Sequence, residues 1–233
     1  MSQTFHLQLA TDTLWSDAQQ LGVSPEQLQA IEIKVQATLS TPFEPYLSLT
    51  YTINLPDTAY DTLAAQLNWS DWQPQKVSFS DYLWQQTCLE CFISTDTARN
   101  YIEINANPDG RYAVYHFTEY REPASLPPPP LYLTDSQRGS IDWATDTKKQ
   151  LNADRESHQQ QHSYERRFGM ALNPLSLGLS GDNALSGNNK WQLHPCVILY
   201  FADVALYFAV AHASPPDFHQ RRYWTTINPI AAS

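Results

Sequence analysis

Two acidic side chains and an amide, on neighbouring predicted strands, are the residues of this sequence best placed to do chemistry. Alternation along residues 87–94 places Glu90 on one face of a strand, and alternation along residues 100–106 places Glu103 and Asn105 on one face of the next. Carboxylates and amides accept and donate hydrogen bonds, so this wall suits a hydroxyl-rich ligand. The alternative is a structural one, in which the wall is a solvated sheet face or a Glu–Arg network that fixes strand register.

A third predicted strand, residues 111–118, completes the block. It begins with Arg111, whose face also carries the aromatic residues Tyr115 and Phe117. The link before it, residues 107–110, reads Asn-Pro-Asp-Gly and predicts a tight hairpin turn. The opposite faces of the first two strands are apolar and suit the core: Leu89, Cys91, Ile93, Ile102, Ile104 and Ala106.

Cys88 and Cys91 form a CxxC pair, which in other contexts binds zinc or exchanges disulfides. Such a pair needs a turn or a helix start, so that both sulfurs converge. Here the pair lies within a predicted strand, where positions three apart point to opposite faces. The remaining cysteine, Cys196, stands alone. We therefore predict ordinary strand cysteines and no metal site.

The seven histidines show no metal-ligand pattern. His158 and His162 lie in a polar, aperiodic stretch, whereas His212 and His219 bracket a Ser-Pro-Pro-Asp-Phe turn and are expected to have structural or hydrogen-bonding roles. The sequence contains no Gly-rich phosphate loop, nucleophile elbow or HExxH motif, and only 7 glycines. We expect no cofactor.

The elements that must position these residues are mostly strands. Further segments with period-2 alternation or continuous apolar character are residues 31–39, 46–55, 164–175, 193–213 (two strands around Ala202 and Asp203) and 223–227. Brief helical turns are expected only at residues 24–30 and 57–67. About nine or ten strands with so little helix predict an all-β protein, an antiparallel two-sheet β-sandwich or jelly roll.

We expect one domain over residues 1–233, because no internal repeat and no linker between two cores is visible. Within it, residues 123–162 are predicted to form a long surface loop or insertion. This segment contains four consecutive prolines, Pro127–Pro130, which cannot join a sheet ladder, and a polar, Gln-rich stretch from Ser136 to His162. A lid that gates a ligand site is the alternative.

The composition of the sequence argues against two classes of partner, nucleic acid and anionic membranes. Asp and Glu outnumber Lys and Arg by 24 to 14, the formal net charge is −10, and no basic cluster is present, so nucleic acid and anionic membranes are not expected. The longest apolar run, residues 196–211, is interrupted by Asp203 and falls short of the roughly 20 residues that span a bilayer. The N-terminus has no secretory signal pattern, and three cysteines fit a reducing compartment, so a cytoplasmic protein is expected.

The block at residues 83–121 resembles the DOMON-like superfamily, in particular family 9 carbohydrate-binding modules and small stand-alone bacterial DOMON-like proteins. The matching residues are Trp84-Gln85-Gln86, Glu90-Cys91-Phe92, Tyr101, Glu103, Pro108 and Gly110. Residues 206–226 resemble the closing strand, aromatic-bearing loop and final strand of the same family. The resemblance implies a jelly-roll β-sandwich of two sheets.

The resemblance also implies a site. In family 9 modules two aromatic side chains clamp a terminal sugar while acids, amides and arginine bond its hydroxyls. Trp84 matches the first aromatic position, and Phe218 is the nearest equivalent of the second, where the family has Trp. Thr87 stands where the family usually carries an acid.

The leading hypothesis is therefore a non-catalytic β-sandwich that binds a small polar ligand, a carbohydrate being the expected one. The expected ligand-binding residues are Trp84 and Phe218 for stacking, Glu90, Glu103, Asn105 and Arg111 for hydrogen bonds, and Arg121, Asp217 and His219 at the rim.

Two alternatives come from other function classes. A glycoside hydrolase or lyase would use Glu90 and Glu103 as paired carboxylates. A haem-binding electron-transfer domain would follow other DOMON relatives, which hold haem between Met and His; Met170 is the one internal methionine. The ligand's identity and the oligomeric state do not follow from the sequence.

Overall fold

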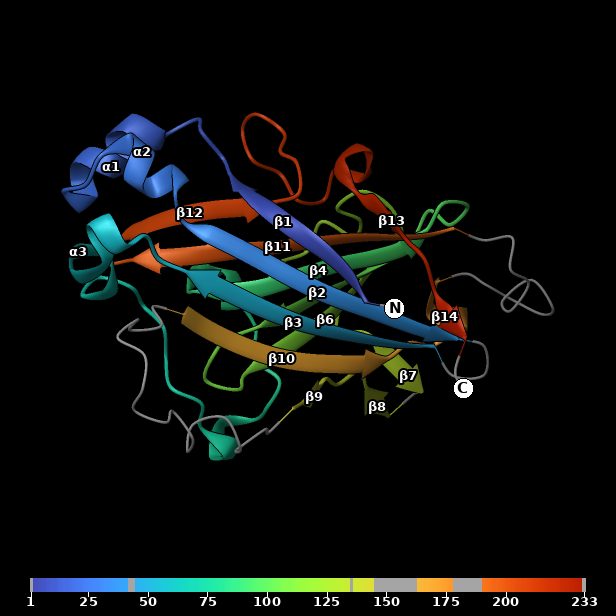
Figure 1. The fold of residues 1–233 in the computed structure, drawn as a ribbon. Coiled ribbons are helices and arrows are strands. Elements are labelled where there is room, and N and C mark those ends of the chain that lie inside the picture. Colours follow the sequence, from blue (N-terminus) through green and yellow to red (C-terminus); the bar gives the residue numbers. More distant parts are fainter. Residues whose placement is uncertain (1, 42–44, 135, 145–162, 178–189, 232–233) are drawn as a thin grey trace.

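The computed structural model describes residues 2–41, 45–134, 136–144, 163–177 and 190–231. Twelve strands form one curled sheet, shown in Figure 1. They are β1 (Gln3–Leu9), β2 (Glu32–Thr41), β3 (Tyr46–Asn54), β4 (Cys88–Thr95), β5 (Tyr101–Ala106), β6 (Tyr112–Phe117), β9 (Asp142–Trp143), β10 (Ser163–Ala171), β11 (Trp191–Phe201), β12 (Val204–Ala209), β13 (Thr225–Ile227) and β14 (Ile230–Ala231). A separate pair contains β7 (Tyr132–Thr134) and β8 (Gln137–Arg138).

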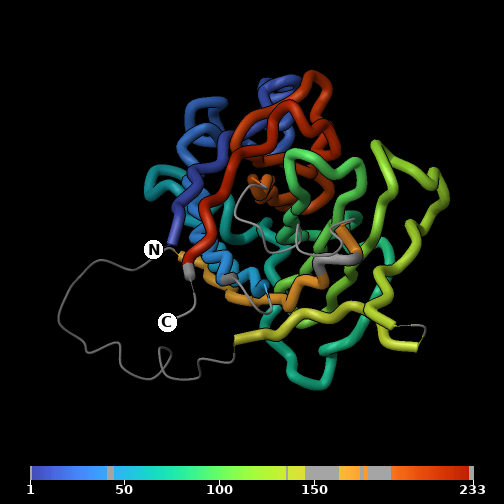
Figure 2. The backbone as a smooth tube through the Cα atoms, turned by 90° about the vertical axis from the view of Figure 1, so that its right-hand side faces the viewer, coloured from blue at the N-terminus to red at the C-terminus, as the bar shows by residue number. Residues whose placement is uncertain are grey.

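The curled sheet folds into two layers. One layer has the order β6-β5-β4-β11-β12, and the other continues as β1-β2-β3-β10-β9. Strand β1 belongs to both, because Gln3–Leu7 pairs with β2 whereas Gln8 and Leu9 pair with β12. In Figure 1 the second layer lies in front of β4, β6 and β11, and Figure 2 shows the two layers from the side. The predicted all-β antiparallel sandwich is confirmed.

The two faces of β4 and β5 separate as the alternation predicts. Leu89, Cys91 and Ile93 join the core between the layers, together with Ile102 and Ile104. The opposite face contributes to a second cluster on the outside of the layer, which we call the outer cluster: Leu83, Cys88, Phe92, Tyr101, Ala113, Tyr115, Phe117, Cys196, Ile198, Ala209, Phe218 and Trp224. Both faces of this layer are therefore covered, the outer one by loops.

Cys88 and Cys91 belong to different clusters, Cys88 to the outer cluster and Cys91 to the core, which confirms that they point to opposite faces. Both are free and buried, as is Cys196. Among the described residues, no group of three or more His, Cys, Asp or Glu side chains is arranged to hold a metal ion.

Helix is sparse, with α1 (Leu14–Leu21), α2 (Pro25–Gln29), α3 (Tyr60–Ala64) and the 3-10 turns η1 (Asp57–Ala59), η2 (Pro74–Lys76), η3 (Leu83–Gln85), η4 (Pro174–Leu177) and η6 (Arg221–Tyr223). The two predicted helical turns correspond to α2 and to η1 with α3. Helix α1 and strand β1 were not predicted. None of the helices in the described ranges is long and apolar enough to cross a bilayer.

The segment predicted as a long loop, residues 123–162, contains β7, β8 and β9 in its first half. Strand β9 returns to the sheet, where Trp143 is opposite Phe168 of β10. The rest of the segment, residues 145–162, lies outside the described residues, and with it His158 and His162.

The turn between β5 and β6 depends on a glycine. Gly110 has φ +114°, which L side chains rarely adopt, and a Cβ there would lie 3.0 Å from the Trp72 ring and 3.3 Å from Val77. We expect Gly110→Ala to lower the free energy of unfolding by about 2–3 kcal/mol, because strain and crowding add. Urea unfolding measures this.

Gly22 provides the matched control. It also has a positive φ, +72°, but a Cβ there would meet no atom within 4 Å. Gly22→Ala should therefore cost only about 1 kcal/mol, the cost of the left-handed backbone alone. If the two variants lose the same free energy of unfolding, the proposed crowding at the β5–β6 turn would be contradicted.

Candidate functional site

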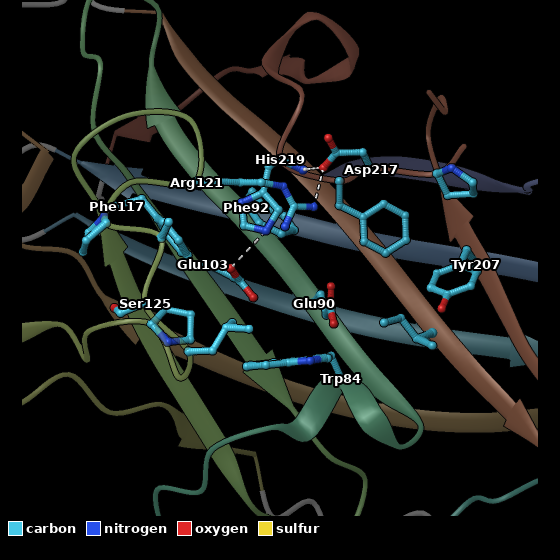
Figure 3. Close-up of a pocket in the computed structure, with 17 residues that line it drawn as sticks. Trp84, Glu90, Phe92, Glu103, Phe117, Arg121, Ser125, Tyr207, Asp217 and His219 are labelled. Carbon is cyan, nitrogen blue, oxygen red and sulfur yellow. Dashed lines mark hydrogen bonds and ion pairs between the residues drawn. The ribbon is translucent and has the colours of Figure 1, made fainter. Parts of the chain in front are cut away.

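A cavity of about 440 Å³ opens on the outer face of the β4–β5 layer (Figure 3). Strands form its floor, and the loops after β6 and β12 form its walls. The lining residues are Trp84, Glu90, Phe92, Glu103, Phe117, Arg121, Pro123, Ala124, Ser125, Leu126, Pro128, Ile198, Tyr207, Pro216, Asp217, Phe218 and His219.

Seven of the nine predicted ligand-binding residues line this cavity: Trp84, Glu90, Glu103, Arg121, Asp217, Phe218 and His219. The other two do not. Asn105 is fully buried next to the cavity and donates a hydrogen bond of 2.7 Å to Glu103 Oε1. Arg111 turns to Asp109, at 3.0 Å, and to Gln86, at 2.8 Å. Asn105 thus acts through Glu103, and Arg111 serves the β5–β6 turn.

The two glutamates are diagonal neighbours across the β4–β5 pair. Glu90 is opposite Asn105, and Phe92 is opposite Glu103, so both carboxyl groups project from the same face. Glu90 is 3% exposed and Glu103 is 5% exposed. Glu90 Oε1 is buried with no hydrogen-bond partner among the described residues. The floor of the cavity therefore holds an acidic pair, one member of which has an unused acceptor.

Burial makes both carboxyl groups difficult to ionise. It raises the pKa of Glu90 well above its usual range, and the nearby Glu103 raises it further. Burial also raises the pKa of Glu103 to about 7, although the Asn105 hydrogen bond and the Arg121 charge oppose the shift. The pair therefore retains a proton at neutral pH, as expected for two carboxyl groups in one apolar cavity.

A hydrogen-bond relay orients His219 at the edge of the pair. The backbone N–H of Arg121 donates to Tyr101 Oη at 3.1 Å, and this hydroxyl lies 2.7 Å from His219 Nδ1. Burial, aided by the Arg121 charge, lowers the pKa of His219 to about 3, so the ring is neutral. We assign the tyrosine hydroxyl as the donor to Nδ1, because its oxygen already accepts from Arg121; this assignment places the ring proton on Nε2, 3.7 Å from Glu103 Oε2. His219 thus directs an N–H donor towards Glu103.

An ion pair at the rim joins the two wall loops. Arg121, at φ 53°, donates to Asp217 Oδ1 at 2.8 Å, and the Tyr120 hydroxyl donates to Oδ2. Asp217 also accepts the backbone N–H of His219 at 3.1 Å. Burial alone would raise the pKa of Asp217, but the hydrogen bonds from Tyr120 and Arg121 outweigh burial and hold it at about 2. Asp217 is therefore charged, and its charge is matched by Arg121.

Aromatic side chains complete the cavity. Half-buried Trp84, on η3, has its ring centroid 5.3 Å from Tyr82 and 6.0 Å from Tyr115. Buried Phe218 lies 6.1 Å from Tyr207. In Figure 3, Trp84 lies on one side of the glutamate pair, and Arg121, Asp217 and His219 lie on the other. The ring of Trp84 thus borders the cavity instead of the core between the layers.

Part of the cavity lining was not predicted from the sequence. Ile198 and Tyr207 were expected only as buried strand residues, but they are paired opposite each other on β11 and β12 and face the cavity. The alternation along β12 separates Tyr207 from Leu206 and Phe208 of the core, a signal that was present in the sequence. Residues 123–126 and Pro128 reach the cavity only through tertiary folding.

The methionine that the haem alternative requires lies elsewhere. Met170 is buried in the core between the layers, on β10, and does not line the cavity. The cavity side of the sandwich therefore offers His219 but no methionine among its described lining residues, which does not fit a Met/His haem site.

No protein-family model matches the chain, and a comparison with curated protein sequences finds no match. Among solved structures, the fold is similar to that of a "putative carbohydrate-binding protein" from Bacteroides uniformis ATCC 8492. The TM-score is 0.50 at 10% sequence identity, and the match covers 97% of this chain and 85% of that chain. At this identity the likeness is one of fold.

Proposed function

We propose that this cavity binds a small polar ligand, a carbohydrate, without altering it chemically. The observation that carries the proposal is the meeting of an aromatic wall, at Trp84 and Phe218, with a buried acidic pair that has an open acceptor. Sugars present both an apolar C–H face and a set of hydroxyls, so they need these two kinds of surface together.

Each group has a role in this proposal. Trp84 packs on the sugar's C–H face, while Glu90 and Glu103 bond hydroxyls from the floor. His219 supplies an N–H donor beside Glu103, and the rim ion pair limits the entrance. The solved structure with a similar fold, described as a "putative carbohydrate-binding protein", supports this proposal, as does the resemblance to DOMON-like and family 9 modules.

Replacing Trp84 by alanine tests the proposal. We expect the affinity for a sugar that binds the wild type to fall roughly thirtyfold, which corresponds to the loss of about 2 kcal/mol from a central aromatic contact. Isothermal titration calorimetry across a panel of hexoses, pentoses and their disaccharides measures it.

Trp15 provides the matched control, because it is 75% exposed and does not line the cavity. Trp15→Ala should leave the affinity unchanged. A flat response of the wild type to every sugar in the panel would contradict carbohydrate binding, and an equal loss in the two variants would contradict the location of the site.

A second candidate is glycoside hydrolysis by Glu90 and Glu103. The observation that favours it is a carboxyl group with a raised pKa beside a second one, an arrangement that supplies an acid and a nucleophile or base. Release of chromophore from aryl glycosides by the wild type, lost in Glu103→Gln, would support hydrolysis over simple binding.

A further inference from the structure

The charge balance of the cavity restricts its ligand. Three acids line it, and among its described lining residues Arg121 is the one Lys or Arg. Because Arg121 is bonded to Asp217 at 2.8 Å, the two charges at the rim match each other. Glu90 and Glu103 form no ion pair with Arg121, which is paired with Asp217, and the other basic side chain of the lining, His219, is neutral.

The open acceptor of Glu90 requires a donor. Buried polar groups of folded proteins are nearly always hydrogen-bonded, and an unsatisfied one is costly. Glu90 Oε1 has no partner among the described residues, and the carboxyl group faces the cavity. A donor that arrives with the ligand would satisfy it.

The walls around the pair favour a cationic donor over a neutral one. Phe92, Phe117, Trp84, Tyr207 and Phe218 line the same cavity, and the faces of aromatic rings attract cations. A protonated amine has three N–H donors, enough for Glu90 and Glu103 together, and carries the charge that the cavity lacks. The net charge of −10 also attracts a cation to the surface.

We propose that the ligand carries a protonated primary amine, which binds between Glu90 and Glu103 while its ring packs on the aromatic wall. This inference rests on the proposed function and narrows it from sugars in general to amino sugars. A neutral sugar carries no charge that would favour ionisation of the pair, and an acidic sugar would add a further negative charge beside it.

Several other titratable groups surround the acidic pair. They are the thiols of Cys88 and Cys196, the phenols of Tyr51, Tyr101, Tyr115, Tyr200 and Tyr207, the imidazole of His219, the guanidinium of Arg121 and the carboxylate of Asp217. Burial raises the pKa of each of these thiols and phenols. These groups therefore keep their protonation state near neutral pH. A proton that is released when a ligand binds in the cavity comes from Glu90 or Glu103.

An amine that binds the pair should therefore release a proton. A nearby cation favours the ionised carboxyl, so at pH 6.5 binding drives off a proton that the free cavity retains. Calorimetry in two buffers of different ionisation enthalpy counts this proton. We expect release of about one proton for 6-amino-6-deoxyglucose and none for glucose.

Affinity is measured at pH 7.5 with glucose, glucosamine and 6-amino-6-deoxyglucose, and with cyclohexylamine as an amine without hydroxyls. We expect at least one aminohexose to bind about tenfold more tightly than glucose or better. Glu90→Gln keeps the shape and removes the charge, so it should abolish this preference. Glu32→Gln, an exposed acid on β2, is the matched control and should keep the preference.

The outcomes separate this inference from the proposed function. Equal affinity for glucose and both aminohexoses, lost in Trp84→Ala, would overturn the amine preference and leave carbohydrate binding intact. If neither the four compounds nor any other sugar binds, both the amine preference and carbohydrate binding are overturned. If cyclohexylamine binds as tightly as the aminohexoses, the result would support an amine site and overturn the proposal that the ligand is a sugar. Thermal unfolding of Glu90→Gln checks that the variant is folded, and Glu103→Gln provides a second test of the same preference.

Discussion

Replacement of Glu90 by methionine should raise the free energy of unfolding of the ligand-free protein by about 3–4 kcal/mol near neutral pH. Glu90 is buried beside Phe92, its Oε1 has no partner, and its charge would face that of Glu103. Methionine has a similar length, fits the aromatic surroundings and leaves no polar group unsatisfied. A buried group that lowers stability fits a role in binding, where its cost is offset by the ligand.

The stability gained by Glu90→Met over the wild type should also grow as the pH rises. The pKa of Glu90 is raised in the folded protein, so above pH 4.5 the unfolded chain loses this proton while the folded one keeps it. The contribution of Glu90 to stability is therefore fully present below pH 4.5 and is lost as the pH rises. Relative to Glu90→Met, the wild type should lose about 1.4 kcal/mol per pH unit for as long as the folded state retains the proton.

Urea unfolding of both proteins at pH 4.5, 6 and 7.5 measures this difference. Glu32→Met is the matched control: Glu32 lies exposed on β2, paired with Lys34 at 3.3 Å, so its replacement should change the free energy of unfolding by less than about 0.5 kcal/mol. A Glu90→Met variant that is less stable than the wild type at pH 7.5, or a stability gain that shrinks as the pH rises, would contradict the unpartnered state of Glu90.

Replacement of Asp109 by alanine should lower the free energy of unfolding by about 3 kcal/mol, because the buried carboxylate accepts several hydrogen bonds. The Asp109 side chain is 1% exposed and lies at the β5–β6 turn. It accepts from Arg111 Nε at 3.0 Å, from Lys76 at 3.3 Å and from the Arg111 backbone N–H at 3.2 Å. Removing it would leave these donors without an acceptor in a partly buried site.

The pH dependence of Asp109 has the opposite sign to that of Glu90. Burial alone would raise its pKa, but the hydrogen bonds and charge of Arg111 outweigh burial and lower it. Its contribution is therefore present at neutral pH and is lost as the pH falls below the usual range of an aspartate. Urea unfolding of the wild type, Asp109→Ala and Asp109→Asn at pH 7 and pH 3 measures it.

The asparagine variant is the control for shape. Asn keeps one acceptor oxygen and removes the charge, so it should lose less stability than alanine at pH 7. Because Asp109 does not line the cavity, both variants should bind ligand with unchanged affinity wherever they are folded. An alanine variant within 1 kcal/mol of the wild type would contradict the role of Asp109 in this turn.

The local pattern of the sequence was enough to predict the faces of the central strands. In a strand successive side chains point to opposite sides, so the alternation along residues 88–93 and 101–106 separates core residues from Glu90 and Glu103 without any knowledge of the partner strands. The Asn-Pro-Asp-Gly turn and the orientation of Cys88 against Cys91 follow from the same local rules.

The alternation of side chains does not predict the orientation of a residue that precedes its strand. Arg111 was placed with Tyr115 and Phe117 by counting in twos, but β6 begins at Tyr112 and Arg111 still belongs to the turn. There the Asp109 carboxylate, two residues away, sets the direction of its side chain. A local ion pair thus determines the orientation of Arg111 in place of the sheet pleat.

Which residues can interact with a ligand was decided by the tertiary structure. The cavity exists because the loops after β6 and β12, about 95 residues apart, are joined by the Arg121–Asp217 ion pair. Tyr207 and Ile198 enter it through the pairing of β11 with β12 and β4. The sequence by itself determined that each of the two glutamates lies on the opposite face of its strand from the core residues. Only the tertiary structure determined that this face is covered and that Glu90 Oε1 lacks a partner among the described residues, because burial and long-range hydrogen bonds depend on which distant segments pack there.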